Sequence, residues 1–246
     1  MNSISADLSL MIKAAEKASK LLIRDFGEVE KLQVSIKGPS DFVSDADKKA
    51  EKIIINELSK SKKGYSILSE ESGKITKSDK NNMWIIDPID GTTNFLHGIP
   101  HFAISIALKL NDEIVSGVIF DPIKNEMFYG EKKNGAYFNN RRIRVSKKKE
   151  IEYCLFATGG KEEIKTTLNV RKSGSAALDM AYVAAGRYDG YFQKNLHLWD
   201  IAAGIILIKE SGGKINEINF SKINDIEIKA SNNTINEKML EKLDNF

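Results

Sequence analysis

The residues from Trp84 to Phe95, W-I-I-D-P-I-D-G-T-T-N-F, place two aspartates where an apolar, strand-like run ends. Two carboxylates as close as Asp87 and Asp90 raise each other's pKa unless something positive lies between them. One interpretation is a plain turn, because Pro88 fixes φ, Gly91 permits unusual backbone angles and aspartates favour turns. The stretch needs a second feature before it indicates a functional site.

The residues after Asp90 supply that second feature. Gly91, Thr92 and Thr93 are expected to open a helix, whose free N–H groups can hold a phosphate. Carboxylates beside such an anion-binding helix start make little sense without bridging cations. The functional interpretation is therefore a site in which cations and a phosphate meet.

Further acidic residues lie at the ends of expected elements. Glu70 and Glu71 follow a short strand, Asp47 ends the capping pattern Ser44–Asp47, and Asp200 opens a helix. Each of them alone is more often structural, and for Glu71 a solvated loop charge is the better interpretation. Their coincidence, in a chain with 3 histidines and 1 cysteine, matches the oxygen ligands that Mg²⁺ prefers. A zinc site is disfavoured, because no histidine or cysteine has a partner at ligand spacing.

The composition limits the classes of protein. The 246 residues carry 37 basic and 34 acidic side chains, a net charge of +3, which does not favour nucleic acid or an anionic membrane as the main partner. The single cysteine, Cys154, excludes an internal disulfide, and the charges spread over residues 1–30 argue against a signal segment. No apolar run is long enough to span a bilayer. We expect a cytoplasmic protein without membrane contact.

Periodicity predicts an α+β protein with layered packing rather than a doubly wound parallel sheet. In the first part we expect a helix from Leu8 to Phe26 closed by Gly27, a second helix from near Ser44 to Leu58, strands at Tyr65–Leu68 and Met83–Ile86, and an antiparallel meander from Phe102 to Val145. The polar run K-K-K-E, residues 147–150, is a plausible boundary. It would divide the chain into an N-terminal subdomain, 1–146, with the main acidic motifs, and a C-terminal subdomain, 147–246, that completes the site.

The C-terminal part mixes helices and strands. The expected elements are helices from Ser175 to Gly186 and from Asp200 to Gly212, strands at Ile215–Ile218 and Ile226–Ala230, and a terminal helix from Thr234.

Three motifs in order carry a resemblance that covers nearly the whole chain. The three motifs are, in chain order, S-E-E-S-G, W-I-I-D-P-I-D-G-T-T-N-F and L-W-D-I-A-A-G-I-I-L-I-K-E-S-G-G; D-F-V-S-D-A-D before them and A-S-N-N after them belong to the same resemblance. The chain resembles the inositol monophosphatase family of Mg²⁺-dependent, lithium-sensitive phosphatases. G-T-T-N-F is more similar to the inositol phosphatase branch than to the nucleotide bisphosphatase branch. The resemblance implies the αβαβα sandwich that this family shares with fructose-1,6-bisphosphatase. It also implies two or three Mg²⁺ ions per site and a homodimer.

The resemblance implies a role for particular residues. Glu70, Asp87 and the carbonyl of Ile89 would bind one cation, and Asp87, Asp90 and Asp200 another. Glu70 and Thr92 would orient and activate the attacking water, and Asp47 would hydrogen-bond Thr92. The residues expected around the substrate are Glu70, Ile89, Asp90, Gly91, Thr92, Gly174, Ser175, Ala176, Gln193 and Asp200.

Two departures from the family pattern bear on the substrate. Gln193 stands where the family usually has a glutamate that binds ring hydroxyls, and the segment from Gly159 to Arg171 is shorter than its counterpart. Inositol 1-phosphate is the family's default substrate. The alternatives are fructose 1,6-bisphosphate, a nucleotide 3′-phosphate, or a regulatory role in RNA metabolism beside the catalysis. The basic stretches 141–144 and 147–150 keep contact with nucleic-acid machinery open, although solvated loops are the preferred interpretation.

Overall fold

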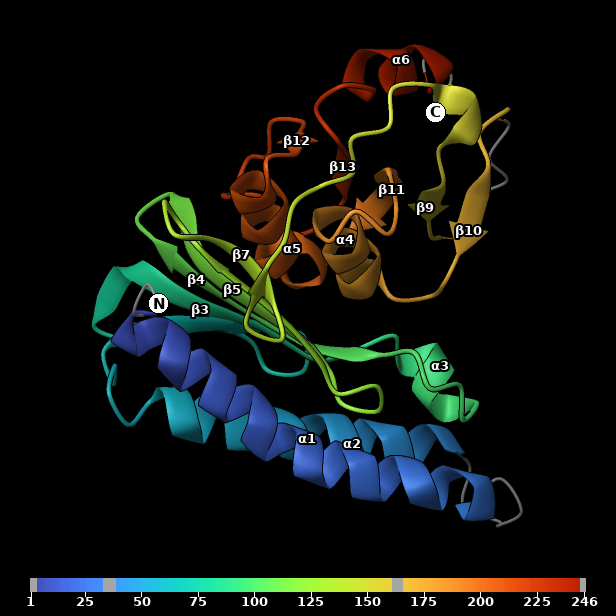
Figure 1. The fold of residues 1–246 in the computed structure, drawn as a ribbon. Helices are drawn as coiled ribbons and strands as arrows, with labels where there is room; N and C mark the ends of the chain where they lie inside the picture. Colours follow the sequence, from blue (N-terminus) through green and yellow to red (C-terminus); the bar gives the residue numbers. More distant parts are fainter. Residues whose placement is uncertain (1–3, 33–38, 161–165, 244–246) are drawn as a thin grey trace.

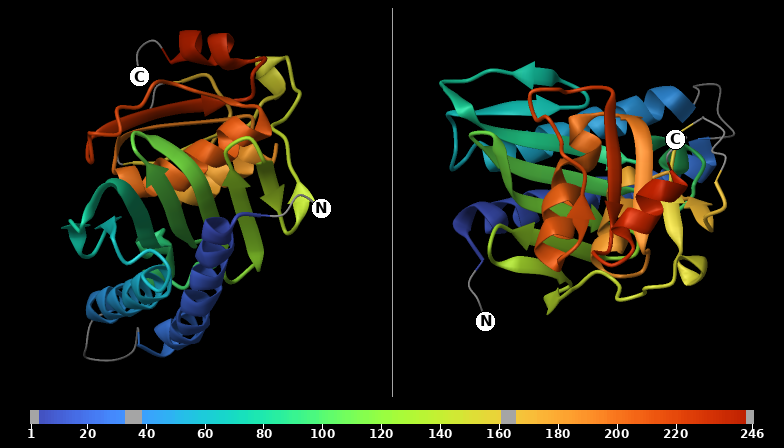
Figure 2. Two further views of the ribbon diagram at one scale, coloured as in Figure 1. Left: turned by 90° about the vertical axis from the view of Figure 1, so that its left-hand side faces the viewer. Right: turned by 90° about the horizontal axis from the view of Figure 1, so that it is seen from above.

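The chain folds into alternating layers of helices and sheets, in the order helix, sheet, helix, sheet, helix (Figures 1 and 2). The computed structural model describes residues 4–32, 39–160 and 166–243. Helices α1 and α2 form one outer layer, α4 and α5 lie between the two sheets, and α6 lies on the far side of the second sheet. The expected αβαβα architecture is confirmed.

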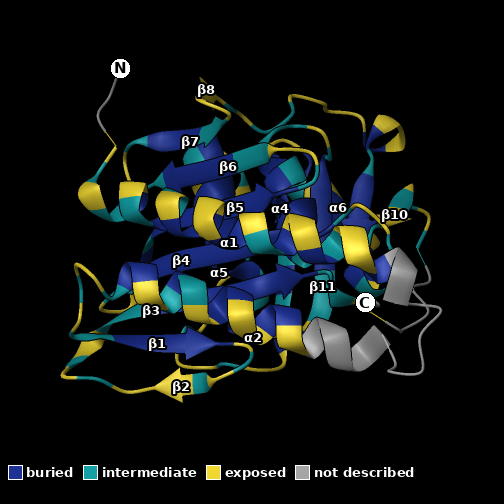
Figure 3. Cartoon of the chain, turned by 90° about the horizontal axis from the view of Figure 1, so that it is seen from below, coloured by how far each residue is buried: buried dark blue, intermediate teal, exposed yellow. Residues whose placement is uncertain are grey.

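The first outer layer is the helix pair α1 (Ala6–Leu32) and α2 (Pro39–Leu58). Figure 3 shows that both helices bury the side that faces the sheet and expose the other. The predicted end of the first helix at Gly27 is wrong. A glycine inside a helix costs only about 1 kcal/mol, and the buried Val29 anchors the following turn to the core.

The second helix begins at Pro39, earlier than the expected start near Ser44. Proline is favoured in the first turn of a helix because its missing N–H has no intrahelical partner there. Asp47 therefore lies well inside α2, and the interpretation of Ser44–Asp47 as a capping pattern is wrong.

The large sheet has eight strands in the order β2-β1-β3-β4-β5-β6-β7-β8. Every neighbouring pair is antiparallel except β1 and β3, which run parallel. The strands are β1 (Tyr65–Ser69), β2 (Gly73–Ile75), β3 (Asp79–Asp90), β4 (Ala103–Leu110), β5 (Glu113–Asp121), β6 (Glu126–Glu131), β7 (Gly135–Phe138) and β8 (Arg141–Arg142). The predicted antiparallel meander and both predicted strands before it are confirmed.

A bulge at the end of β3 aims both of its aspartates to one side. Asp87 pairs with Ser105 and Asp90 with Ala103, so three steps on β3 oppose two on β4. In a regular strand, residues three apart point to opposite faces. The one-residue bulge, at a proline that cannot donate a ladder hydrogen bond, places the two side chains on the same face.

The central layer consists of α4 (Ala176–Ala184) and α5 (Leu198–Ser211), which are buried between the two sheets. Close packing depends on Gly117 of β5, where a Cβ would lie 2.8 Å from the Ala203 carbonyl oxygen. Ser175 caps α4 and Gly212 caps α5, as expected, but α5 begins at Leu198, before Asp200.

The second sheet has five strands in the order β10-β9-β11-β13-β12. Its elements are β9 (Phe156–Thr158), β10 (Val170–Lys172), β11 (Gly190–Leu196), β12 (Lys214–Ile215) and β13 (Ile226–Ser231), followed by α6 (Asn236–Lys242). The strands β9, β10 and β11 were not predicted, and β12 and α6 are shorter than expected. A short 3₁₀ turn, Ile151–Tyr153, and the short helix α3 (Thr92–Leu96) complete the described elements. Within the described ranges, no helix has the length and apolar content needed to cross a bilayer.

Candidate active site

Three aspartates from two distant elements converge between the sheet and the central helices. Asp87 and Asp90 come from the end of β3, and Asp200 from the first turn of α5. One carboxylate oxygen of each lies within 4.8 Å of the others. Asp87 and Asp90 are buried, and Asp200 is partly buried.

Local hydrogen bonds fix each of these carboxylates. Asp87 Oδ1 accepts the N–H of Ile89 at 3.0 Å, within the bulge. Asp90 Oδ2 accepts the hydroxyl of Ser175 and, at 2.9 Å, the N–H of Ala177, which ties β3 to the start of α4.

Asp200 is held by the residue that precedes its helix. Its Oδ2 accepts the N–H of His197 at 2.8 Å. Asp200 is therefore the N3 residue of a capping box rather than the N-cap expected from the sequence. The N-cap is His197, whose ring stacks on Trp199 with centroids 4.7 Å apart.

Burial, followed by mutual repulsion, raises the pKa of every acid in the cluster. The pKa of Asp87 lies well above its usual range, because burial is reinforced by the charges of Glu70, Asp90 and Asp200. Burial also raises the pKa of Asp90 and of Asp200 to about 7 in each case. In the part of the chain that the structure describes, no lysine or arginine forms a salt bridge with any of the three aspartates.

A divalent cation fits this cluster. Two unit charges 4.8 Å apart repel each other by about 3.5 kcal/mol at an effective dielectric constant of 20. Three such pairs would amount to about 10 kcal/mol, comparable with the whole net stability of a domain. The cluster is tolerable only when it is protonated or neutralised, and its all-oxygen donor set suits a hard cation.

Glu70 stands next to the cluster, at the first position after β1. Its N–H donates to the Ile86 carbonyl at 3.3 Å, and Glu70 lines the same cavity as the three aspartates. Burial of its carboxyl end raises the pKa of Glu70, although a hydrogen bond with Asp87 works in the opposite direction.

Asp47 lies behind Glu70 on α2. Its Oδ1 is buried without a hydrogen-bond partner, and burial together with the charges of Glu70 and Glu71 raises the pKa of Asp47 to about 8. The hydroxyl of Thr92, which was expected to meet Asp47, instead donates to the Ile89 carbonyl at 3.0 Å. The hydrogen bond implied between Asp47 and Thr92 is thus not formed in this structure.

Gly91 and Thr92, where the chain enters α3, line the site. Gly91 precedes α3 with φ +99°, and a Cβ there would lie 3.2 Å from the His101 carbonyl and 3.3 Å from the Gly174 carbonyl, so only glycine fits. The Asn94 amide donates to the carbonyls of His101 and Ser173. These bonds tie α3 to the loop that leads into β4 and to the loop that leads into α4.

A cavity of about 280 Å³ opens over the cluster. Its lining includes the expected ligand and substrate residues: Glu70, Asp87, Ile89, Asp90, Gly91, Thr92, Gly174, Ser175, Ala176, Gln193 and Asp200. It also includes Gly159 and Gly160, from the segment expected to be shortened, and three residues that were not predicted as site residues: Asp179, Leu196 and His197. Asp179 could have been found from its place on the same helix as Ser175, in the turn that follows it.

Gln193 lies on the rim formed by β11. Its Oε1 accepts the hydroxyl of the buried Tyr191 at 2.7 Å, and the side chain is so close to Gly159 that a Cβ there would clash with Oε1. The amide is therefore held in one place. Residues 161–165 of the segment expected to be shortened lie outside the described residues.

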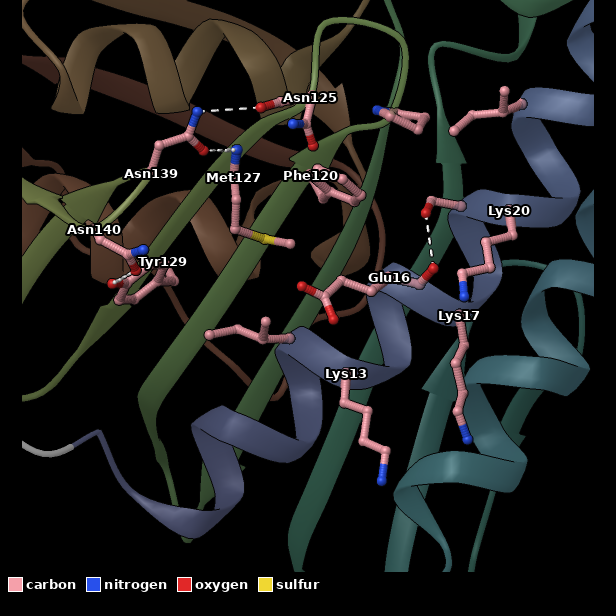
Figure 4. A pocket seen from close by; sticks show the side chains of 14 residues that line it. Lys13, Glu16, Lys17, Lys20, Phe120, Asn125, Met127, Tyr129, Asn139 and Asn140 are labelled. Atoms are coloured by element: carbon pink, nitrogen blue, oxygen red, sulfur yellow. Dashed lines mark hydrogen bonds between the residues drawn. The ribbon is translucent and has the colours of Figure 1, made fainter.

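A larger cavity of about 750 Å³ lies elsewhere, between α1 and the strands β5 and β6 (Figure 4). Several of its polar groups are already engaged by the fold. Asn139 bonds the Met127 N–H and the Asn125 carbonyl, and the Tyr129 hydroxyl donates to Asn140. The smaller cavity, with its cluster of acids, is the better candidate for chemistry.

Comparison with known proteins agrees with this geometry. The family model described as the inositol monophosphatase family matches residues 5–245. The chain belongs to the inositol monophosphatase family. The resemblance carried by the three motifs is thereby confirmed, and with it the class of phosphoric monoester hydrolases.

Individual relatives support the same family. An inositol-1-monophosphatase of Rhizobium meliloti is 49% identical over 85% of this chain and 84% of its own length. A protein named Nus factor SuhB, from Xylella fastidiosa, is 40% identical over 85% of this chain and 80% of its own. The crystal structure of the extragenic suppressor protein suhB from Bartonella henselae matches with a TM-score of 0.86 and 44% identity, covering 98% of this chain and 100% of that one.

Proposed function

We propose that this chain is a Mg²⁺-dependent phosphatase that hydrolyses inositol 1-phosphate to inositol and phosphate. The observation that carries the proposal is the cluster of Asp87, Asp90 and Asp200, whose mutual repulsion bound cations would relieve without protonation of the carboxylates. The inositol-1-monophosphatases among its relatives support inositol 1-phosphate as the substrate. The cavity, about 280 Å³, suits a small phosphorylated polyol.

The acidic residues and one backbone carbonyl would hold the cations. Glu70, Asp87 and the Ile89 carbonyl would form one set of ligands, and Asp87, Asp90 and Asp200 a second, with Asp87 shared. When bound, the cations supply charge neutralisation for the attacking and leaving oxygens of an in-line displacement. We infer two or three ions per site.

The protein's own groups would position the reactants. Glu70 and Thr92 lie on the cavity wall, where their side chains would orient the attacking water. The N–H groups of Gly91 and Thr92 would hold phosphate oxygens. Since α3 has only 5 residues, these groups would act locally rather than through a helix dipole.

Asp47 would contribute through charge and position. Its Oδ1 is buried without a hydrogen-bond partner, and burial together with the charges of Glu70 and Glu71 raises the pKa of Asp47. A rearrangement that brings Asp47 to Thr92 would give Asp47 Oδ1 a donor, in exchange for the hydrogen bond from the Thr92 hydroxyl to the Ile89 carbonyl. We retain this pairing as a proposal for the cation-loaded enzyme.

The rim residues would select the substrate. Gly174, Ser175 and Ala176 would contact the phosphorylated end, and Gln193 would contact the ring hydroxyls. Because the Tyr191 hydroxyl already donates to Gln193 Oε1, the amide would offer mainly its N–H groups to the ligand. We also propose that the protein forms a homodimer and lies in the cytoplasm.

A phosphate-release panel tests the function. The substrates are inositol 1-phosphate, fructose 1,6-bisphosphate, a nucleotide 3′-phosphate and glycerol 2-phosphate, each with and without Mg²⁺ and with added lithium. We expect inositol 1-phosphate to have the highest kcat/KM and lithium to inhibit. A clear preference for either of the other two biological substrates would replace the assignment.

A second role beside catalysis is favoured by one comparison, the relatives named Nus factor SuhB at 39–40% identity. A role in RNA metabolism would then be carried by the surface rather than by the carboxylates. The Asp87→Asn variant separates the two. If the Asp87→Asn variant restores normal growth to a strain that lacks the gene, the second role is independent of catalysis.

A further inference from the structure

The loop that carries Glu70 is held by a buried carboxylate on a neighbouring helix. Glu70 and Glu71 lie in the tight connection between β1 and β2, where Ser69 pairs with Gly73. Glu51 of α2 is 4% exposed and lies behind this loop. Nothing in the sequence motifs singles it out.

Three hydrogen bonds join Glu51 to both ends of the loop. Glu51 Oε2 accepts the Ser69 hydroxyl and, at 3.2 Å, the Ser72 N–H. Glu51 Oε1 accepts the Ser72 hydroxyl. Both carboxylate oxygens are thus engaged at the residues that flank Glu70 and Glu71.

The helix presents Glu51 on the face that packs against the large sheet. Ile54 and Leu58, three and seven residues further on, are fully buried on that face, and Asp47 lies four residues before. The packing of α2 therefore fixes the position of the Glu51 carboxylate. A rigid element thereby determines the position of an otherwise short, solvent-facing loop.

The negative charge of Glu51 has a cost at this position. It adds to the repulsion that raises the pKa of Asp47 and, as a smaller contribution, that of Glu70 and Glu71. A charged acceptor nevertheless makes stronger hydrogen bonds than a neutral one. The three donors compensate this charge, which leaves Glu51 no free oxygen for a cation.

We propose that Glu51 is a positioning residue: its carboxylate clamps Ser69 and Ser72, and thereby holds Glu70 toward Asp87. The inference rests on the proposed function, since it assumes that Glu70 is a cation ligand. Residues that orient ligands in this way typically change metal affinity or activity by about 10–100-fold when mutated.

The test is the affinity of the cation-free protein for Mg²⁺ alone, measured by titration calorimetry without substrate. We expect Glu51→Ala to weaken binding by about 10–100-fold. Glu51→Gln keeps one acceptor oxygen, and its affinity for Mg²⁺ should lie between those of the wild type and Glu51→Ala. The double variant Ser69→Ala/Ser72→Ala keeps the Glu51 charge but loses two donors, and it should also bind more weakly.

Glu57→Gln is the matched control. Glu57 lies on the same helix, is 3% exposed, and bonds Lys17 and Lys60 instead of the loop. The Glu57→Gln variant should be less stable than the wild type but should bind Mg²⁺ with the same affinity. At saturating Mg²⁺, KM for the substrate should stay unchanged in the Ser69→Ala/Ser72→Ala variant.

Two results would overturn the proposal. One is wild-type Mg²⁺ affinity in the double variant Ser69→Ala/Ser72→Ala, which would show that the hydrogen bonds from the two serines do not affect cation binding. This result can be obtained even if Glu51→Ala fails to fold. The other is a loss in Glu57→Gln equal to that in Glu51→Ala, which would indicate general destabilisation. Because Mg²⁺ binding is measured without turnover, a wild-type protein that binds Mg²⁺ but hydrolyses nothing contradicts the proposed function and not this inference.

Discussion

Asp87→Asn should abolish activity and stabilise the cation-free protein. Asparagine keeps the oxygen that accepts the Ile89 N–H, so the bulge should persist. Asp87 takes part in two of the pairs within 4.8 Å, which together would cost about 7 kcal/mol if all three aspartates were ionised. Proton uptake reduces this figure, because the pKa of all three is raised, and we expect a gain of about 1–3 kcal/mol at pH 8.

The gain should depend on pH with a definite sign. An acid whose folded pKa is raised destabilises the fold increasingly as pH rises above the unfolded value of about 3.9. The cation-free wild type should therefore lose stability relative to Asp87→Asn between pH 5 and pH 8. Each kcal/mol corresponds to a shift in Tm of about 2–4 °C for a chain of this size.

The assay is thermal unfolding in a chelator and in saturating Mg²⁺, with phosphate release in parallel. Mg²⁺ should raise the Tm of the wild type much more than that of Asp87→Asn, and turnover of the variant should fall by roughly 10³-fold. Asp121→Asn is the matched control. Asp121-Pro122-Ile123 repeats the sequence and the turn hydrogen bond of Asp87-Pro88-Ile89, but the Asp121 carboxylate forms a salt bridge with Lys124. The reasoning is refuted if Asp87→Asn lowers the chelated Tm or keeps near-normal turnover.

Three other substitutions test separate parts of the account. Asp200→Ala loses a capping-box bond worth about 0.5–2 kcal/mol and should give folded, inactive protein; an early-melting protein with normal specific activity would leave only the capping role. Gln193→Glu should lower KM for inositol 1-phosphate and barely change hydrolysis of glycerol 2-phosphate, whereas a raised KM would point to another natural substrate. The pKa of Glu57 is lowered to about 2 by hydrogen bonds to Lys17 and Lys60, so its stabilising contribution is present above pH ~4.3 and is lost toward pH 2. Urea unfolding should show a smaller loss of stability over this range for Glu57→Gln, and an identical loss would contradict that contribution.

The sequence predicts best where local chemistry and periodicity coincide. The β3 stretch combines an apolar run, a proline and two aspartates, and its strand and acidic end were predicted from those residues, whereas the bulge between Asp87 and Asp90 was not. Helix ends were predicted less well. Gly27 is tolerated inside α1 because tertiary packing of Val29 outweighs a weak local preference, and Pro39 starts α2 ahead of the polar pattern at Ser44.

The contacts that hold the site join residues far apart in the sequence. Ser175 and Asp90 are separated by 85 positions, and Ser72 and Glu51 by 21. Neither pair has a local sequence signature, because the layers of the fold bring them together. The short strands β9, β10 and β11 were missed for a related reason: their partners, rather than any alternation of their own, define them.

The decisive experiment compares Mg²⁺-dependent release of phosphate from inositol 1-phosphate by the wild type and by Asp87→Asn. The proposed function predicts hydrolysis by the wild type that requires Mg²⁺ and is lost in the variant, together with Mg²⁺ binding that stabilises only the wild type strongly. Hydrolysis that persists in a chelator, or equal turnover by both proteins at saturating Mg²⁺, would contradict it.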